Sequence, residues 1–204
     1  GKSTLFSLLT GLRRTAHGSI EINGEELHQN KSKVMSQMGV VFQQSTLDLD
    51  LTVKQNLFYY ASLHGIAPKK ALQNIELILE QLSLTERLDD KVRTLNGGHR
   101  RRVEIARALI HQPKILLLDE ATVGLDVDSR MLIISYVRSL CAKQDICVLW
   151  TTHLMDEVQP DDQLIIINNG DIQAQAKSSQ LYKQYNVEDT YQLYFSLTQN
   201  TEAV

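Results

Sequence analysis

The sequence predicts an α/β fold in which a mostly parallel sheet carries an antiparallel flank and an inserted helical segment. Short apolar runs rich in branched residues recur between helical patterns, a turn signal at Asn23-Gly24 divides an alternating segment, and the strand pattern stops between Thr52 and Leu95. Continuous apolar runs suit strands buried on both faces, as in parallel sheets. One domain is expected, because 204 residues with 43% hydrophobic content can bury a sizeable core.

The expected strands are short apolar runs bounded by turn or helix signals. Five runs qualify: residues 20–22, 39–42, 115–118, 146–150 and 164–167. The first lies in SIEINGEEL, whose alternation around Asn23-Gly24 predicts a hairpin and therefore the antiparallel flank. The run LIII at 164–167 is continuous, like ILLL at 115–118, so both are expected to be covered on two faces. A further alternating strand, IQAQA, follows Asn169-Gly170.

The stretch between Thr52 and Leu95 is expected to be a helical insertion. Its apolar residues have the spacing of one helix face: Leu72, Ile75, Leu79 and Leu82. Pro68 follows Gly65 at a point where a helix can restart, which predicts a boundary between two helices. A second helical pattern lies near the end of the chain, and its stripe is expected to pack against the core: Val187, Tyr191, Tyr194, Phe195 and Thr198.

Composition and charge argue against several classes of protein. The net charge of −3 and a pI of about 6.1 disfavour a general nucleic-acid binder, which carries a basic face. No apolar run approaches the roughly 20 residues that span a bilayer. Cys141 and Cys147 are too few and too close for a disulfide framework, so buried thiols in an intracellular chain are expected. The chain opens on GKSTL without an initiator methionine, which indicates a segment of a longer protein.

The first four residues match the end of the phosphate-binding pattern G-x-x-x-x-G-K-[ST]. Gly1 lets the backbone approach a phosphate, and the amides that follow lie at a helix start, where the dipole and unpaired N–H groups favour an anion. Lys2 would reach the β- and γ-phosphates, and the hydroxyl of Ser3, next to Thr4, would hold Mg²⁺. Alone, GKST is also compatible with a surface turn that precedes a helix.

A second signal lies in KILLLDEA, where an apolar strand ends in Asp119 and Glu120. In P-loop enzymes, the acidic residue that closes such a strand holds Mg²⁺ together with the P-loop hydroxyl, and Asp119 fits that role. Glu120 follows directly and can polarise a water for attack on the γ-phosphate. Together with GKST, this strand predicts an ATPase or GTPase with the mostly parallel, RecA-like sheet of the P-loop NTPases.

The run LNGGHRRRVEIARAL contains a second candidate anion site. Asn96 is a suitable N-cap, Gly97 and Gly98 expose backbone N–H groups, and the helix that is expected to start near His99 adds its dipole. One nucleotide does not need two separate cradles, so the second one is expected to serve a nucleotide held by another copy of the chain. The alternative is a glycine C-cap followed by a basic, solvated helix.

These motifs, in this order and spacing, resemble those of the nucleotide-binding subunits of ABC transporters over essentially the whole chain. GKST is similar to the end of Walker A, LNGGH to the signature motif, and ILLLDE to Walker B with the catalytic Glu120. The resemblance implies that Gln43 in VVFQQ senses Mg²⁺ and the γ-phosphate, that Asp126 in VGLD belongs to the D-loop, and that His153 in TTH is the switch histidine. It implies catalytic roles for Glu120, His153 and Gln43, and metal ligands at Ser3, Gln43 and Asp119.

The chain departs from the family pattern at several positions. Asn96 replaces the usual signature serine, and His99 replaces the usual glutamine, so a titratable His99 is expected to make activity depend on pH. Ala121 stands where the family has proline, so the turn after Glu120 is expected to be less stiff. The aromatic residue that stacks on adenine lies upstream in the family, so residues 1–204 alone are expected to bind ATP poorly.

The resemblance also implies a domain organisation and a set of partners. It predicts one nucleotide-binding domain that lacks its N-terminal strands, with a core at 1–43 and 111–180, a helical subdomain at 44–110 and a tail at 181–204. The cofactors are ATP and Mg²⁺. The partners are a second copy and an integral membrane permease, which would dock near STLDLDLTVKQNL and hold the chain at the cytoplasmic face of the inner membrane. No nucleic-acid partner is expected.

The DLDLT segment, the HRRRVEIARAL helix and the tail resemble those of single-domain subunits of export-type (ABC-2) systems. Within that group, the chain resembles a bacterial subgroup associated with quinoprotein (PQQ-dependent) alcohol oxidation. Two alternatives stay open at this point. A soluble ABC ATPase that acts on ribosomes or nucleic acid would share the same motifs. A P-loop kinase for a small molecule would leave LNGGH and VGLD unexplained.

Overall fold

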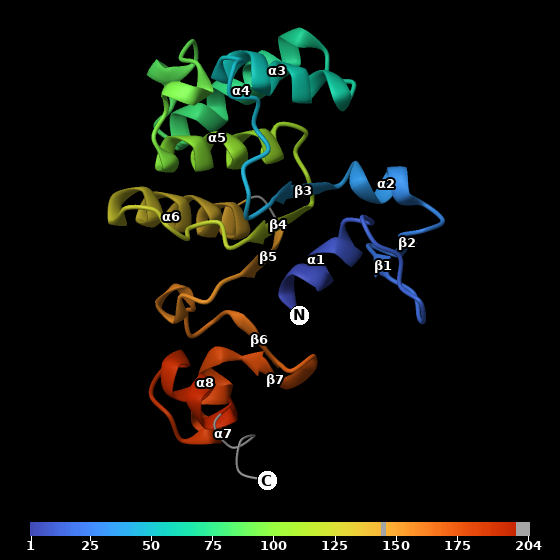
Figure 1. Ribbon diagram of the computed structural model, residues 1–204, viewed down its shortest axis with the longest axis vertical. Helices are drawn as coiled ribbons and strands as arrows, with labels where there is room; N and C mark the ends of the chain where they lie inside the picture. The colour runs from blue at the N-terminus through green and yellow to red at the C-terminus, as the bar shows by residue number, and fades with distance from the viewer. Residues whose placement is uncertain (144–145, 199–204) are drawn as a thin grey trace. The chain divides into compact units, whose positions relative to one another are not determined.

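The computed structural model describes residues 1–143 and 146–198 (Figure 1). Residues 199–204 of the predicted tail lie outside this range. The chain divides into two compact units, one formed by residues 6–151 and the other by residues 1–5 together with 152–204.

The larger unit contains a parallel sheet of three strands in the order β3-β4-β5. Their bounds are Met38–Val41 for β3, Ile115–Asp119 for β4 and Cys147–Thr151 for β5. Leu116 and Leu118 on β4 are completely buried and Leu117 is 2% exposed, so the central strand is covered on both faces, as the continuous run ILLL predicts. The parallel sheet of the predicted fold class is therefore confirmed.

The antiparallel flank is also confirmed. Strands β1 (Glu21–Ile22) and β2 (Glu25–Glu26) pair antiparallel. Asn23 and Gly24 turn the chain with φ values of 53° and 75°, both in the left-handed region that Asn and Gly tolerate best. Helices α1 (Lys2–Leu9) and α2 (Lys31–Met35) flank this hairpin along the chain. Within the larger unit, a small core forms from Phe6, Leu27, Val34, Met38 and Leu117.

The helical insertion between β3 and β4 is present, as the sequence predicts. It comprises α3 (Val53–Leu63), α4 (Pro68–Gln81), the 3₁₀ turns η1 (Thr85–Arg87) and η2 (Val92–Thr94), and α5 (Gly97–Leu109). Thr52 and Gln55 form a capping box at the start of α3. Gly65, with φ of 67°, departs from the helical conformation after α3, and Pro68 occupies the first turn of α4. The predicted boundary between two helices is therefore confirmed.

The predicted buried face of α4 is confirmed at three of its four residues. Ile75, Leu79 and Leu82 are buried, whereas Leu72 is 38% exposed and Ala71 is buried in its place in the first turn. Helices α3, α4 and α5 lie together at one end of the larger unit, and α6 (Val127–Lys143) runs beside the sheet (Figure 1). Their apolar faces share one core with β4.

The smaller unit is built on an antiparallel hairpin of β6 (Gln163–Asn168) and β7 (Asp171–Lys177). The prediction that LIII is covered on both faces is wrong: β6 belongs to a two-stranded sheet, and Ile165 is 44% exposed. The unit also contains η3 (Met155–Glu157), α7 (Ser178–Tyr185) and α8 (Thr190–Thr198). None of the helices in the described ranges has the length and apolar character needed to cross a bilayer.

Two further side-chain predictions need correction. The predicted stripe packs against the core only in part: Val187 and Tyr194 contact the core of the smaller unit, whereas Tyr191 is 59% and Phe195 is 37% exposed. These two rings contact each other instead, with centroids 4.6 Å apart. The prediction that Cys141 and Cys147 are buried thiols is wrong, because both residues are exposed.

Candidate functional site

The carboxyl ends of the three parallel strands bring together residues that are far apart in the sequence. Gln43 lies just beyond β3 and Glu120 just beyond β4, and Gln43 Nε2 donates a hydrogen bond to Glu120 Oε2 at 3.0 Å. A carboxylate only accepts hydrogen bonds, so this contact fixes the orientation of the Gln43 amide. The Gln43 carbonyl oxygen Oε1 is therefore the atom that can serve as a ligand to a hard cation.

Asp119 is held at the same edge by Thr151, the last residue of β5. Asp119 is 7% exposed, and its Oδ1 accepts a hydrogen bond of 2.6 Å from the Thr151 hydroxyl. The Thr151 carbonyl accepts from the Glu120 amide at 3.0 Å. Thr151 is not among the residues predicted for the site, although it is the first residue of TTH and directly follows an apolar run. Its hydroxyl and carbonyl orient both acidic residues at once.

Glu120 has an unusual backbone conformation, with φ of 49°. The left-handed region is sparsely populated for residues with a Cβ, and such a residue costs of order 1–3 kcal/mol, commonly at functional sites. A hydrogen bond of 3.3 Å from the Val123 amide to the Glu120 carbonyl closes the turn that follows. Ala121, in the position where the resemblance expects proline, is fully buried. The turn therefore directs the Glu120 side chain toward Gln43 rather than along the strand.

The second candidate anion site is the N-terminus of α5. Asn96 is its N-cap, and its Oδ1 accepts from the His99 amide at 2.8 Å, as predicted. The helix begins at Gly97, which is two residues before the expected start at His99. Gly97 and Gly98 therefore lie in the first helical turn, where backbone N–H groups have no acceptor within the helix. This geometry rules out the alternative of a glycine C-cap.

Gly98 is required by close packing against the start of α6. A Cβ at Gly98 would lie 2.2 Å from Ser129 Oγ and 3.4 Å from Asp126 Oδ2, whereas one at Gly97 would meet nothing within 4 Å. Asp126 Oδ1 in turn accepts from the Ser129 amide at 2.9 Å. That hydrogen bond lowers the pKa of the Asp126 carboxyl. The structure thus brings Asp126 together with the LNGGH residues.

The His99 ring is held by the same Asn96 oxygen that caps the helix. His99 Nδ1 lies 2.7 Å from Asn96 Oδ1, and because that oxygen also accepts from the His99 amide, it is an acceptor for both contacts. Neutral His99 therefore carries its proton on Nδ1, and its unprotonated Nε2 can only accept a hydrogen bond. Partial burial, followed by the positive charges of Arg102 and Arg87, lowers the His99 pKa.

The GKST residues and His153 belong to the smaller unit. Helix α1 begins at Lys2, as expected for a helix that starts at a phosphate loop, and Ser3 and Thr4 are exposed. Lys2 Nζ donates to the Thr152 carbonyl at 3.3 Å. His153, the next residue, is exposed. The structure therefore places the Lys2 ammonium beside the residue that precedes His153.

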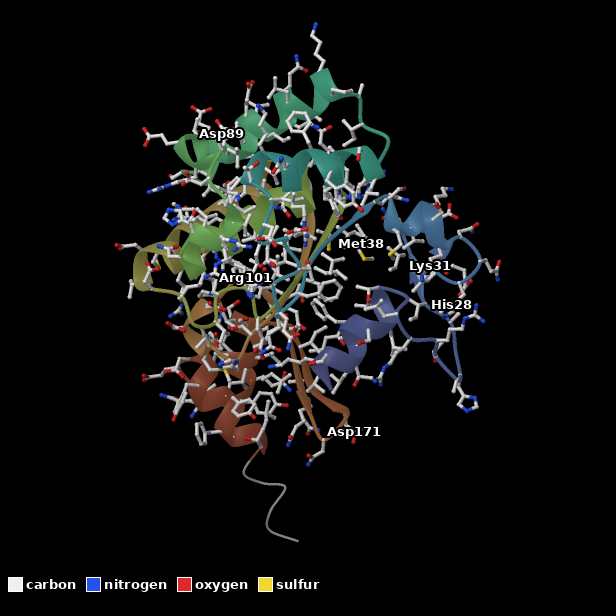
Figure 2. All side chains as sticks on the ribbon, turned by 45° about the horizontal axis from the view of Figure 1, so that its top comes forward. His28, Lys31, Met38, Asp89, Arg101 and Asp171 are labelled. Carbon is white, nitrogen blue, oxygen red and sulfur yellow. The ribbon has the colours of Figure 1, made fainter. Side chains whose placement is uncertain are left out.

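Two of the three consecutive arginines on α5 are buried and do not form a solvated basic face. Arg101 and Arg102 are each 8% exposed. Arg102 Nη1 donates to the Leu82 carbonyl at 3.0 Å, whereas Arg101 contacts the Gln43 segment. Figure 2 shows Arg101 among the interior side chains of the larger unit and Asp89 at its outer edge. These contacts could not be predicted from the sequence, because a run of charged residues usually indicates a solvated face.

The parallel sheet, with an acidic pair and a glutamine at its carboxyl edge, defines an α/β protein of the P-loop NTPase class. The family model described as "ABC transporter" matches residues 1–123. The chain belongs to the ABC transporter family. The predicted family is therefore confirmed, whereas the subgroup associated with quinoprotein alcohol oxidation stays a prediction.

Named relatives agree with this assignment. The linearmycin resistance ATP-binding protein LnrL of Bacillus subtilis is 35% identical over 173 residues, which are 84% of this chain and 55% of the relative. The Nod factor export ATP-binding protein I of Ralstonia nicotianae is 36% identical over 182 residues, covering 89% of this chain and 56% of that protein. The chain thus spans about half the length of these curated relatives.

Solved structures support the fold. An ATP-binding subunit of an ABC transporter matches with a TM-score of 0.86 and 23% identity, covering 97% of this chain and 83% of the other. The protein cbiO1 of Clostridium perfringens, part of the transporter complex cbiONQ, matches with a TM-score of 0.77 over 90% of this chain and 75% of its own. The predicted fold class is therefore confirmed.

Proposed function

We propose that the chain binds ATP with Mg²⁺, hydrolyses it to ADP and phosphate, and thereby drives transport through a separate membrane subunit. The observation that carries this proposal is the hydrogen bond between Gln43 and Glu120 beside Asp119, at the carboxyl edge of a parallel sheet. Phosphoryl transfer needs positioned polar groups more than covalent chemistry, and this edge supplies them.

The donor set at the sheet edge fits Mg²⁺, which prefers oxygen ligands. Asp119 would bind it through Oδ2, since Oδ1 accepts from Thr151, and Gln43 would bind it through Oε1. Ser3 in GKST would add its hydroxyl. When bound, Mg²⁺ neutralises charge on the β- and γ-phosphates.

The remaining residues of the first site would act on phosphate and water. Lys2, with Gly1 and Thr4 around it, would bind the β- and γ-phosphates through its ammonium and the backbone amides of the α1 start. Glu120 would accept hydrogen bonds from the attacking water and polarise it. His153 would donate to the γ-phosphate.

The α5 N-terminus would serve the nucleotide bound by a second copy of the chain. Gly97 and Gly98 offer first-turn amides, and the Asn96 NH₂ group can donate to a phosphate because its oxygen is engaged by His99. Asp126, which lies beside Gly98, would belong to the same contact between copies. ATP would therefore join two copies, and its hydrolysis would separate them.

The membrane partner would dock on the helical insertion. We assign residues 44–110 to a helical subdomain, residues 1–43 and 111–180 to the core, and residues 181–204 to a tail. Within the insertion, Asp48 and Asp50 are exposed and Leu49 is 42% exposed, so this segment offers both acidic and apolar contacts to a partner helix. Docking there would place the chain at the cytoplasmic face of the membrane.

Export is the direction that we propose, because the relatives are named for Nod factor export and linearmycin resistance. The same names disfavour the alternative of a soluble ABC ATPase on ribosomes or nucleic acid. The small-molecule kinase alternative would leave the packing of Gly98 against Asp126 and Ser129 without a role.

The test uses the intact natural protein, tagged and carrying Glu120→Gln to trap ATP. It is purified from detergent-solubilised membranes, and the copurifying proteins are identified by mass spectrometry. A stoichiometric polytopic membrane protein is the expected result, whereas recovery with ribosomes or nucleic acid would overturn the transport proposal. Wild type should hydrolyse ATP, Glu120→Gln should lose about 10²–10⁴-fold in rate, and the exposed-site control Glu86→Gln should retain activity.

A further inference from the structure

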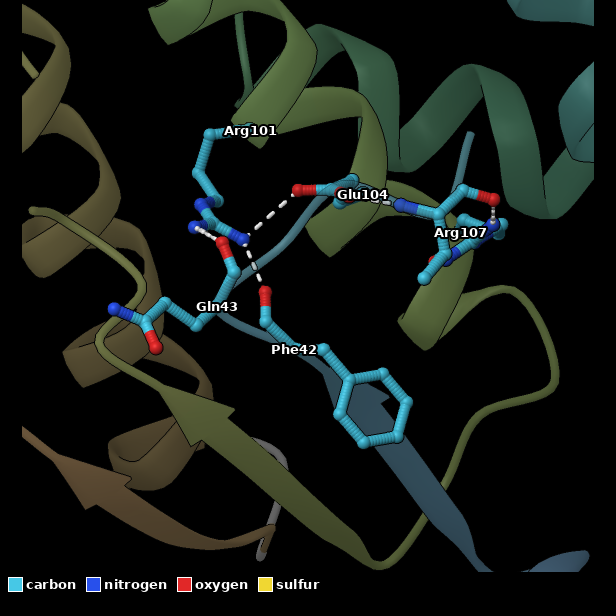
Figure 3. Close-up of polar contacts among 6 residues, drawn as sticks. Phe42, Gln43, Arg101, Glu104 and Arg107 are labelled. Atoms are coloured by element: carbon cyan, nitrogen blue, oxygen red, sulfur yellow. Dashed lines mark hydrogen bonds and ion pairs between the residues drawn. The ribbon is translucent and has the colours of Figure 1, made fainter. Parts of the chain in front are cut away.

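Beyond the strand ends, the backbone of the Gln43 segment is fixed by two residues of α5. Arg101 Nη1 donates to the Phe42 carbonyl at 2.6 Å and Nη2 to the Gln43 carbonyl at 2.9 Å. Glu104 Oε2 accepts from the same guanidinium at 2.9 Å, and its Oε1 accepts from the Thr46 amide at 3.0 Å. Figure 3 shows these contacts, with the Gln43 side chain directed away from Arg101. The segment from Phe42 to Thr46 is therefore attached to α5 through its backbone.

Arg107, one turn further along α5, completes the attachment. Its Nη1 donates to the Thr46 carbonyl at 2.9 Å, and its guanidinium lies over the Tyr60 ring, 5.4 Å from the centroid. The Thr46 backbone thus binds Glu104 through its amide and Arg107 through its carbonyl. Three side chains of one helix thus hold a segment that, within residues 1–143 and 146–198, is not part of any strand.

The burial of this network indicates a positional role. The side chains of Arg101 and Glu104 are 9% and 4% exposed. Buried ion pairs contribute little net stability compared with apolar packing, because desolvation offsets the attraction. A guanidinium can bind two neighbouring carbonyls and a carboxylate in one plane, which an apolar side chain cannot do. Such a network constrains geometry more than it adds stability.

We propose that Arg101 is a positioning residue for Gln43. By holding the Phe42 and Gln43 carbonyls against α5, Arg101 sets the point from which the Gln43 amide reaches Glu120. The same helix carries the Gly97 and Gly98 amides at its N-terminus. A shift of α5 caused by phosphate at its start would therefore move Gln43 relative to Glu120. This role rests on the proposed ATP hydrolysis.

The kinetic test is a double-mutant cycle of Arg101→Lys and Gln43→Ala in the intact protein. Lysine keeps the charge beside Glu104 but lacks the planar fork that spans two carbonyls. Arg101→Lys should lower kcat for ATP about tenfold and change KM less than about twofold, because misplacement of a group affects the chemical step. In the Gln43→Ala background, the same substitution should have less than about a twofold further effect. Full additivity of the two losses would overturn the proposal.

Arg102→Lys is the matched control, since Arg102 is equally buried on the same helix but binds the Leu82 carbonyl. Its kinetic effect should add fully to that of Gln43→Ala. Hydrogen exchange of residues 42–46 without nucleotide gives a second readout: Arg101→Lys and Glu104→Gln should accelerate it, and Arg102→Lys should not. Unchanged exchange in Arg101→Lys would overturn the positioning role even if wild type hydrolyses ATP. An inactive wild type with accelerated exchange in Arg101→Lys would instead count against the proposed function alone.

Discussion

The amide of Gln43 donates to the carboxylate of Glu120 at 3.0 Å, across 77 residues of sequence. The two residues follow β3 and β4, which are adjacent in the parallel sheet with Val41 opposite Leu118. A neutral amide orients the carboxylate without adding a positive charge beside it. A lysine or arginine in the same place would add one. The hydrogen bond thus holds the Glu120 side chain in place at the edge of the sheet.

The Thr151 hydroxyl should control metal binding through Asp119. Thr151→Val keeps the shape of the side chain but removes the donor of the 2.6 Å bond to Asp119 Oδ1. The Mg²⁺ concentration needed for half-maximal ATP hydrolysis should rise about tenfold or more, because hydrogen-bond partners of metal ligands orient them. The free energy of unfolding should fall by about 1–2 kcal/mol. Both are measured by Mg²⁺ titration of the rate and by urea unfolding.

Thr10→Val provides the control for this experiment. Thr10 is as buried as Asp119, and its hydroxyl donates to the Phe6 carbonyl at 2.7 Å. The substitution should lower stability by a similar amount of about 1–2 kcal/mol and leave the Mg²⁺ titration unchanged. Equal Mg²⁺ dependence in the two variants would show that Thr151 has only a structural role.

The two glycines of LNGGH should respond differently to alanine. In Gly98→Ala the new methyl would meet Ser129 Oγ at 2.2 Å, so α5 or α6 must shift, and overpacking of this kind costs about 1–3 kcal/mol. Gly97→Ala has open space, and Ala favours the helix, so stability should be unchanged or slightly higher. Urea unfolding compares the two variants, and equal stabilities would contradict the close approach of α5 to α6. Ser129→Gly should partly rescue Gly98→Ala.

His99 should make ATP hydrolysis depend on pH. The Nδ1 proton is held by Asn96, so Nε2 becomes a donor to phosphate only when the ring is protonated. Burial, then Arg102 and Arg87, lower its pKa, while Asp126 and Asp90 act in the opposite direction, so the neutral ring predominates at pH 7.5. The rate of wild type relative to His99→Gln should therefore rise as pH falls from 8 to 6. Parallel pH profiles of the two proteins would refute this assignment.

Local signals in the sequence were sufficient for the elements around the site. Asn96 and Pro68 act through hydrogen bonds and backbone angles within one helical turn, so their roles as N-cap and helix start could be predicted. The buried strand ending in Asp119 has a similarly local signature. The sheet edge could be inferred because parallel strands share it, which explains why Gln43 and Glu120 meet.

Contacts that depend on tertiary packing could not be predicted in this way. Two of the partners of Arg101 are backbone carbonyls 58 and 59 residues away, and no side-chain pattern identifies a carbonyl as an acceptor. The continuous apolar run in β6 predicts a strand buried on both faces. The strand instead forms a two-stranded sheet with β7, which leaves Ile165 exposed. Periodicity gives the faces of an element, whereas the neighbouring elements decide which face is covered.

His111 should destabilise the fold at acid pH. Its Nε2 lies 3.2 Å from the Met38 carbonyl, which fixes the proton on Nε2, and its buried Nδ1 has no partner in the described part of the chain. Burial, then His64 stacked at 3.9 Å, lowers the His111 pKa to about 4. The unfolded chain has the ordinary histidine pKa of about 6.5, so it binds protons more readily than the folded protein below that pH. The contribution of His111 to the free energy of unfolding is therefore fully present above pH 6.5 and is lost as the pH falls toward 4.

The measurement is urea unfolding of wild type and His111→Gln at pH 7 and pH 5. Glutamine can still donate to the Met38 carbonyl but cannot be protonated, so the variant should lose less stability on acidification, by about 1 kcal/mol after allowance for solvent screening of a half-buried ring. His17→Gln, at an exposed histidine, should lose as much as wild type. If His111→Gln and His17→Gln respond alike, the acid sensitivity arises from other groups. A smaller loss confined to His111→Gln would assign the acid sensitivity to the His111 ring, whose Nδ1 has no acceptor among the described residues for a second proton.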